Sequence, residues 1–272
     1  MSTLEVPGAD LHFEATGSGP VLLLIPGGNG DAAPYAPLAA AFADRHTVVA
    51  YDRRGYSRSR LHEPVDPATR LDADVADVLA LIDAHGDEPA HVFGSSSGAV
   101  VGLHLLARHP SRVRVLVAHE PPLVGLLPDA EELFAFLDGV RELYRTEGVE
   151  KAMRVFNERI GIPGEERPRL DQLPAQLREM LERVEANLPF FLEHELTVYP
   201  RLTPEEEPLA AVADKLVLAG GEDSRDHFPY RPNIVLGARL GLAVNDLPGD
   251  HIGYISRRET FPAALAALFA GN

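Results

Sequence analysis

Five consecutive aliphatic residues, Val21 to Ile25, constrain the fold of this chain more than any other feature. An unbroken apolar run of this length is typical of a strand buried on both faces, as the strands of a parallel sheet are. The segment 26–31 that follows contains three glycines and is expected to form a loop. The run therefore predicts a parallel sheet covered by helices on both sides.

Similar apolar runs alternate with helical patterns along much of the chain. We expect strands over 4–6, 11–15, 21–25, 46–51, 90–93, 113–118, 215–219 and 242–247, and helices over 33–43, 71–85, 97–108, 232–240 and 257–269. Strands that alternate with helices predict an α/β fold with a mostly parallel, doubly wound sheet.

The alternation stops at the pair Pro121-Pro122. From 123 to 208 the pattern is helical and rich in charge, with a break at 161–168 and no strand pattern. We therefore expect an α/β core formed by residues 1–122 and 209–272, and a helical cap, or lid, formed by residues 123–208.

Composition narrows the class of partner. The 272 residues carry a formal net charge of -16, which disfavours nucleic acids and anionic membrane surfaces as partners. No apolar run approaches the roughly 18 residues of a membrane-spanning helix, and the expected location is the cytoplasm. The chain has no cysteine and no histidine spacing typical of a metal site, so we expect no bound metal. No cofactor is expected either. The oligomeric state stays open, with a homodimer as one alternative.

The segment HVFGSSSGAV at 91–100 carries the main chemical signal. It matches the pattern G-x-S-x-G between a predicted strand and a predicted helix, where a sharp turn exposes the central serine. The glycines Gly94 and Gly98 fix the register, so Ser96 is the expected nucleophile and Ser97 offers its backbone N–H to an oxyanion. The alternative is a structural glycine-serine turn without chemistry.

A serine nucleophile needs a base and an oxyanion hole. His251 follows the last predicted strand and is the only one of the 11 histidines beyond residue 227, so it is the expected base rather than a structural loop histidine. The glycine-rich loop after 21–25 would supply the second oxyanion donor from Gly28, and Asn29 would contact the substrate. The alternative for this loop is a turn without a ligand.

Two carboxylates follow neighbouring predicted strands, and either one could orient His251. Glu120 follows the strand at 113–118, and Asp223 follows the strand at 215–219. Both are expected at the edge of the sheet where ligands bind, so their positions in the sequence do not choose between them. The structural alternatives are a hinge residue for Glu120, and for Asp223 an ion pair with Arg225 or Arg231.

These residues together resemble the α/β-hydrolase superfamily over nearly the whole chain. The closer resemblance is to the zearalenone lactone hydrolases, through IPGGNGD at 25–31, YDRRGYSRS at 51–59, FGSSSGA at 93–99, AHEPP at 118–122, NLPFFLEH at 187–194 and LPGDHIGYIS at 247–256. In those enzymes the acid is the glutamate of the equivalent His-Glu motif, so the resemblance favours Glu120 over Asp223. It also implies a scaffold role for Asp52, Arg54 and Ser57.

The resemblance has one clear departure in the cap. The lactone hydrolases have a tryptophan in the stretch that aligns with NLPFF, whereas this chain has no tryptophan and carries Phe191 there. A phenylalanine keeps an apolar wall but lacks the indole N–H. Phe190, Phe191 and Tyr199 are candidate substrate contacts, and ordinary packing in the helix core is the alternative.

The function expected from the sequence is cofactor-independent hydrolysis of a small-molecule carboxylic ester or lactone, including a macrolactone, through an acyl-enzyme on Ser96. The alternatives are a thioesterase or a C–C hydrolase acting on a polyketide-type intermediate, and a non-catalytic ligand-binding member of the same fold.

Overall fold

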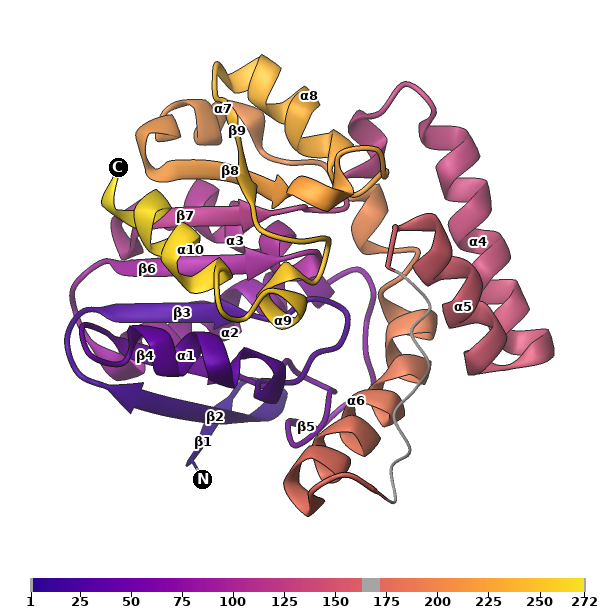
Figure 1. Ribbon diagram of the computed structural model, residues 1–272, viewed down its shortest axis with the longest axis horizontal. Helices are drawn as coiled ribbons and strands as arrows, with labels where there is room; N and C mark the ends of the chain where they lie inside the picture. The colour runs from indigo at the N-terminus through magenta and orange to yellow at the C-terminus, as the bar shows by residue number, and fades with distance from the viewer. Residues whose placement is uncertain (1, 163–171, 272) are drawn as a thin grey trace.

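A twisted sheet runs through the computed structural model, which describes residues 2–162 and 172–271 (Figure 1). Its strands are β1 (Ser2–Val6), β2 (Ala9–Gly17), β3 (Val21–Ile25), β4 (Thr47–Tyr51), β5 (Arg60–Leu61), β6 (Ala90–Ser95), β7 (Val113–His119), β8 (Leu216–Gly221) and β9 (Val244–Leu247). Their order is β1-β2-β4-β3-β6-β7-β8-β9, and β5 pairs with β2. The strands from β4 to β9 in this order are parallel, while β1, β2 and β5 pair antiparallel. The predicted α/β fold with a mostly parallel sheet is confirmed.

Helices cover both faces of this sheet. Side chains alternate along the buried strand β3: Leu22 and Leu24 belong to one apolar core, and Leu23 and Ile25 belong to another. The first core is covered by α1 (Ala36–Phe42) and α10 (Phe261–Ala270), and the second by α2 (Arg70–His85), α3 (Ser97–Arg108) and α8 (Arg231–Leu240). Because both faces of β3 are buried, its sequence is apolar throughout rather than alternating.

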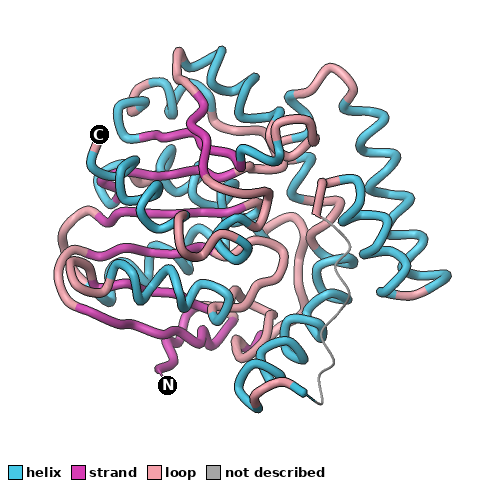
Figure 2. The backbone as a smooth tube through the Cα atoms, viewed as in Figure 1, coloured by secondary structure: helices cyan, strands magenta, loops and turns pink. Residues whose placement is uncertain are grey.

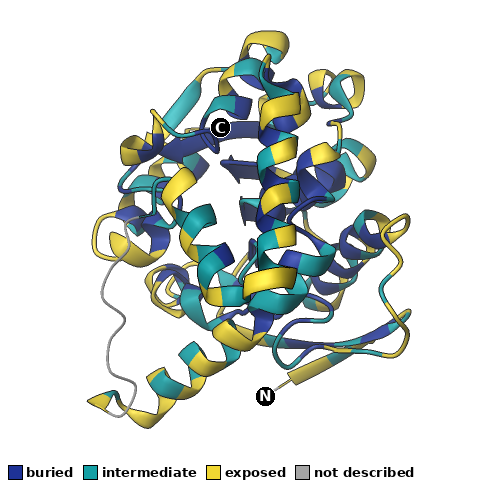
Figure 3. Ribbon diagram, turned by 90° about the vertical axis from the view of Figure 1, so that its right-hand side faces the viewer, coloured by how far each residue is buried: buried dark blue, intermediate teal, exposed yellow. Residues whose placement is uncertain are grey.

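The segment predicted as a cap lies beyond the carboxyl ends of the parallel strands (Figure 1). Its main helices are α4 (Ala130–Glu147), α5 (Val149–Arg159) and α6 (Ala175–His194), and the short α7 (Glu206–Ala210) returns to the core. Helices α4, α5 and α6 share an apolar cluster that includes Leu137, Ala152 and Leu192. Figure 3 views this side and shows exposed outer faces on the helices, with buried strands behind them. The predicted break at 161–168 falls mostly outside the described residues.

The end of the chain differs from the sequence prediction. One helix was expected over 257–269, but the structure has a short α9 (Gly253–Ser256), a turn over 257–260 and then α10 (Figure 2). Pro262 occupies the first turn of α10, where its missing N–H and fixed φ are tolerated. The proline therefore sets the start of this helix, and the prediction for 257–260 was wrong.

Candidate active site

Ser96 lies in a sharp turn between β6 and α3. Its backbone has φ 56° and ψ −126°, a strained conformation for a residue with a side chain. A Cβ atom at Gly94 would lie 2.5 Å from Gly98 O, and one at Gly98 would lie 2.3 Å from Ile25 O. Only glycine fits at both positions, so the strand and the helix approach each other closely and hold Ser96 at the turn. The Ser96 N–H donates to His119 O at 2.8 Å, which fixes the turn against β7.

Two backbone segments flank Ser96. The loop after β3 passes so close that a Cβ atom at Gly27 would lie 2.9 Å from Ser96 Cβ. On the other side, Ser97 is the first residue of α3, where the helix leaves its N–H groups unpaired and carries partial positive charge. Within residues 2–162 and 172–271, neither the Gly28 N–H nor the Ser97 N–H donates to a backbone or side-chain acceptor. Both groups therefore have the capacity to bind a ligand oxygen.

A buried carboxylate holds the imidazole of His251. His251 Nδ1 lies 2.5 Å from Glu120 Oε2, and the Gly221 N–H donates to Glu120 Oε1 at 2.8 Å. Burial acts to raise the pKa of Glu120, but the hydrogen bond and charge of His251 outweigh it, and the pKa falls below its usual range. The ionised carboxylate keeps the proton on Nδ1, so Nε2 is left as an acceptor.

Asp223, the second candidate acid, lies elsewhere. Its side chain is exposed and pairs with Arg257 Nη2 at 3.3 Å. The expected alternative pairings are absent for this residue, because Arg225 binds Asp246 and Arg231 binds Asp129. The structure therefore brings Glu120, and not Asp223, to His251.

His119 adds a neutral buried ring beside this pair. Its Nδ1 lies 3.4 Å from Ser95 Oγ, and its ring centroid lies 6.3 Å from that of His251. Burial, assisted by the charge of His251 and opposed by that of Glu120, lowers the pKa of His119 to about 4. The ring is therefore uncharged at neutral pH and does not compete with His251 for Glu120.

A small cavity of about 30 Å³ opens at Ser96, between residues that follow the sheet strands and residues of the segment predicted as a cap. Its wall is mostly apolar, and it is lined by Ser96, Ser97, Pro122, Leu137, Phe156, Phe191, Glu195, Leu196, Tyr199, Pro200 and Phe228. Phe191 packs directly on the glycine loop, since a Cβ atom at Gly28 would lie 2.5 Å from its ring. Of the two flanking segments, α3 lines the cavity through Ser97, and the glycine loop contacts the cavity wall at Phe191.

The four predicted substrate contacts divide into two pairs. Phe191 and Tyr199 line this cavity, whereas Phe190 and Asn29 do not. The Phe190 ring packs against Tyr56 at a centroid distance of 4.8 Å. The backbone carbonyl of Asn29 accepts a hydrogen bond from the Asn187 side chain of α6 at 2.7 Å. In this structure Phe190 and the Asn29 backbone contact other protein residues, and their role as substrate contacts stays a prediction.

Sequence reasoning missed a buried ion pair at the cavity, formed by Glu195, which lines it, and Arg53 behind it. Glu195 lines the cavity with a buried carboxylate, which accepts from Arg53 Nη1 at 2.8 Å and from Tyr56 Oη at 2.7 Å. Arg53 lies in the motif YDRRGYSRS beside Arg54, and Glu195 directly follows α6. Neither residue stands out in the sequence, because Arg53 follows a predicted strand in a polar motif and Glu195 lies in a helical segment rich in charge.

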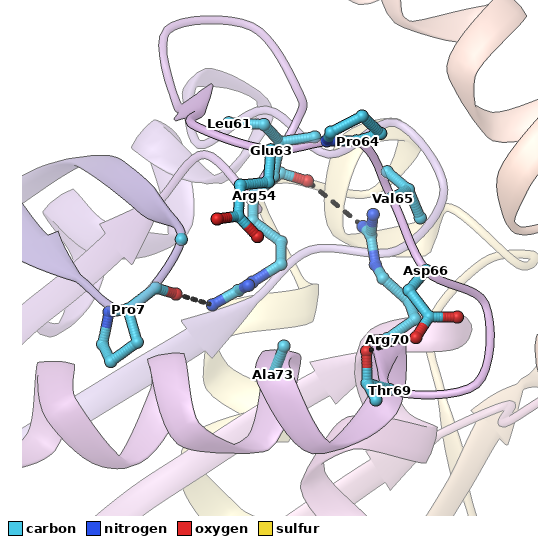
Figure 4. A pocket seen from close by; sticks show the side chains of 11 residues that line it. Pro7, Arg54, Leu61, Glu63, Pro64, Val65, Asp66, Thr69, Arg70 and Ala73 are labelled. Atoms are coloured by element: carbon cyan, nitrogen blue, oxygen red, sulfur yellow. Dashed lines mark hydrogen bonds between the residues drawn. The ribbon is translucent and has the colours of Figure 1, made fainter.

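A larger hollow of about 410 Å³ lies between the β1–β2 turn, the loop 61–66 and the start of α2 (Figure 4). Arg54 and Arg70 face it, but each is already engaged by a carboxylate: Arg54 by Asp77 at 2.5 Å and Arg70 by Asp74 at 3.0 Å. No serine, histidine or backbone elbow lines this hollow. The cavity at Ser96 is therefore the candidate active site.

Residues 2–162 and 172–271 contain no group of three or more histidine and acidic side chains placed to hold a metal ion. None of their helices combines the length and the apolar character needed to cross a bilayer.

Known proteins resemble the chain over its whole length. Residues 20–156 match the profile of the alpha/beta hydrolase fold family. An uncharacterized hydrolase, YraK of Bacillus subtilis (strain 168), is 36% identical over 269 residues, which cover 97% of this chain and 93% of that protein. A zearalenone hydrolase of Bionectria ochroleuca is 27% identical over 277 residues, covering 96% and 94%. The crystal structure of an alpha/beta hydrolase from Sphaerobacter thermophilus DSM 20745 superposes with a TM-score of 0.71 at 25% identity, covering 99% of both chains. The chain therefore belongs to the α/β-hydrolase family and is a hydrolase.

Proposed function

We propose that this hydrolase cleaves carboxylic esters or lactones through an acyl-enzyme on Ser96. One observation carries the proposal: Ser96 lies in a strained elbow whose N–H binds the His119 carbonyl, and the next residue, Glu120, is buried, ionised and bound to Nδ1 of His251. A serine, a histidine and a carboxylate are the nucleophile, base and orienting acid that serine hydrolases use. Glu120, rather than Asp223, is the acid in this proposal.

The reaction then proceeds in two halves. His251 Nε2 takes the Ser96 hydroxyl proton as Ser96 Oγ attacks the carbonyl carbon, and the Gly28 and Ser97 N–H groups bind the oxyanion. The intermediate collapses with breakage of the ester C–O bond, and His251 gives its proton to the leaving alkoxide. A water molecule, deprotonated by His251, attacks the acyl-enzyme in the same way and releases the acid and Ser96. Glu120 stabilises the imidazolium formed in each half.

The cap would determine which substrates bind. In our proposal residues 123–208 form the cap, residues 1–122 and 209–272 form the core, and the mostly apolar wall selects an apolar acyl or alcohol part. The cavity is small, about 30 Å³, and Phe191 packs on the glycine loop beside it, so we expect substrate binding to displace this side chain. The 27% identity to a zearalenone hydrolase supports a lactone as one substrate to test.

The test compares the wild type with Ser96→Ala on two substrates, zearalenone and 4-nitrophenyl acetate. Mass spectrometry follows ring opening of the first, and absorbance follows nitrophenolate release from the second. We expect wild-type turnover of at least the aryl ester, and a loss of about 10⁴-fold or more in Ser96→Ala. Turnover that survives in Ser96→Ala, or wild-type protein that neither hydrolyses an ester nor reacts with a fluorophosphonate at Ser96, would refute the proposal.

A further inference from the structure

A buried ion pair joins the core to the cap beneath the candidate active site. Arg53, in the loop after β4, donates through Nη1 to Glu195 Oε1 at 2.8 Å, and the two side chains are 0% and 1% exposed. Arg53 Nη2 also binds Asp74 Oδ2 at 2.9 Å. Glu195 follows α6, so the contact exists only while the cap is docked on the core.

The same two side chains hold both segments that flank Ser96. Arg53 Nη1 lies 3.4 Å from Gly27 O and 3.2 Å from Ser97 Oγ, and the Ser97 hydroxyl donates to Glu195 Oε1. The Gly27 carbonyl and the Gly28 N–H belong to one planar peptide group, so a contact that fixes the oxygen also fixes the direction of the N–H. One guanidinium and one carboxylate therefore restrain both proposed oxyanion donors.

Stability alone does not account for this ion pair. Burying two charges carries a large desolvation cost, and apolar side chains of similar volume usually stabilise a core at least as well. Arg53 Nε is also buried without a hydrogen-bond partner among the described residues, which adds to that cost. The contacts with Gly27 and Ser97 supply a different role for the pair.

We propose that Arg53 and Glu195 are positioning residues that align the oxyanion hole, and that docking of the cap completes this alignment because Glu195 comes from the cap. The inference rests on the proposed serine-hydrolase function. Neither residue takes or gives a proton in the reaction. Their effect is to hold the Gly28 and Ser97 N–H groups where negative charge develops, which lowers the barrier without changing how tightly the ester itself binds.

The test uses two variants of the full chain and one control. Glu195→Gln removes the charge and keeps the shape. Arg53→Met combined with Glu195→Met removes both charges of the pair. This double variant is used if Glu195→Gln, which leaves Arg53 without its Glu195 partner, is too unstable to purify. Asp77→Asn is the control, because it weakens a comparably buried pair with Arg54 that does not touch the oxyanion segments. For each protein, kcat and KM for 4-nitrophenyl acetate and the inhibition constant of an aryl trifluoromethyl ketone, which forms an oxyanion on the serine, are measured.

We expect kcat to fall about 10- to 100-fold in both variants, less than the 10²–10³ of a deleted oxyanion donor. KM should stay within about threefold, and the inhibition constant should rise in parallel with the loss of kcat. Asp77→Asn should lower the melting temperature but leave kcat and the inhibition constant unchanged.

Each other outcome counts against a defined proposal. Ser96-dependent turnover in the wild type, with kcat and inhibition unchanged in a folded double variant, overturns the positioning role and leaves the proposed function standing. A wild type with no Ser96-dependent turnover refutes the proposed function, and the positioning role falls with it. A loss that appears equally in Asp77→Asn shows a general effect of stability and also overturns the positioning role.

Discussion

Replacing Glu120 by glutamine tests the candidate triad at its most constrained point. The two oxygens of Glu120 accept from different donors, Oε1 from the Gly221 N–H at 2.8 Å and Oε2 from His251 Nδ1 at 2.5 Å. A glutamine has one oxygen and one NH₂ group. If its oxygen faces Gly221, the NH₂ group faces Nδ1, which must then give up its proton to accept the hydrogen bond.

The wrong tautomer of His251 sets the size of the effect. With Nδ1 as acceptor, the neutral ring carries its proton on Nε2 and cannot take the proton of Ser96. Trapping a triad histidine in the wrong tautomer costs about 10⁴-fold in kcat, or about 5 kcal/mol in the activation barrier. The opposite orientation of the amide would place its NH₂ group against the Gly221 N–H, with two donors facing each other and no acceptor. This orientation is therefore unfavourable as well.

The assay is the steady-state kcat for 4-nitrophenyl acetate at about pH 8, with Asp223→Asn as the matched control. Asp223 is exposed and pairs with Arg257, so Asp223→Asn should keep kcat within about twofold of the wild-type value. Thermal melts of both variants check that the fold is retained. Glu120→Gln with near-wild-type kcat, or a large loss in Asp223→Asn instead, would refute the assignment of Glu120 as the acid.

Three further predictions follow from the described contacts. Phe191→Ala should raise by about tenfold the preference, as a ratio of kcat/KM, for 4-nitrophenyl benzoate over the acetate, whereas Phe190→Ala, outside the cavity, should not change the ratio. Burial holds the pKa of His119 at about 4, against 6.5 in the unfolded chain, so the unfolded state binds more protons between these values. The free energy of unfolding should therefore fall by about 2 kcal/mol through this group as the pH is lowered from about 7 to 5. Urea unfolding of His119→Phe should lack that part of the decline, and an identical decline would contradict it. Gly98→Ala should destabilise by roughly 1–3 kcal/mol or more, because its Cβ would meet Ile25 O, whereas Gly139→Ala in α4, with open space around it, should stabilise slightly in the same melts.

The parts of the candidate site that could be predicted are those fixed by the backbone. The glycines around Ser96 and the position of His251 after the last parallel strand depend on turns, which leave a pattern in the sequence. The choice between Glu120 and Asp223 depends on which side chain reaches His251 from neighbouring strands, and the strand order alone does not contain that information. The structure separates them by their partners, because Glu120 is buried against His251 and Asp223 is exposed and paired with Arg257.

The cap side chains were harder to predict for a geometric reason. Phe190 and Phe191 are adjacent in α6, and successive residues of a helix point about 100° apart, so one faces the cavity and the other faces Tyr56. Arg53 and Glu195 escaped notice because charged residues are usually exposed, and their burial depends on partners far away in the sequence.

The position of the predicted cap in the chain has a consequence for how freely this segment can change. Strands β7 and β8 lie side by side with Leu116 paired to Leu216, so the whole predicted cap is one long connection between neighbouring strands. The entropy of closing a loop grows only with the logarithm of its length, so an excursion of about 100 residues costs roughly 2 kcal/mol more than one of about 15. Glu120 follows β7 directly and Gly221 ends β8, and the Gly221 N–H donates to the Glu120 side chain at the carboxyl edge of the sheet. Caps of very different length and sequence therefore fit between the same two strands, while the hydrogen bond that anchors the histidine's partner stays in place.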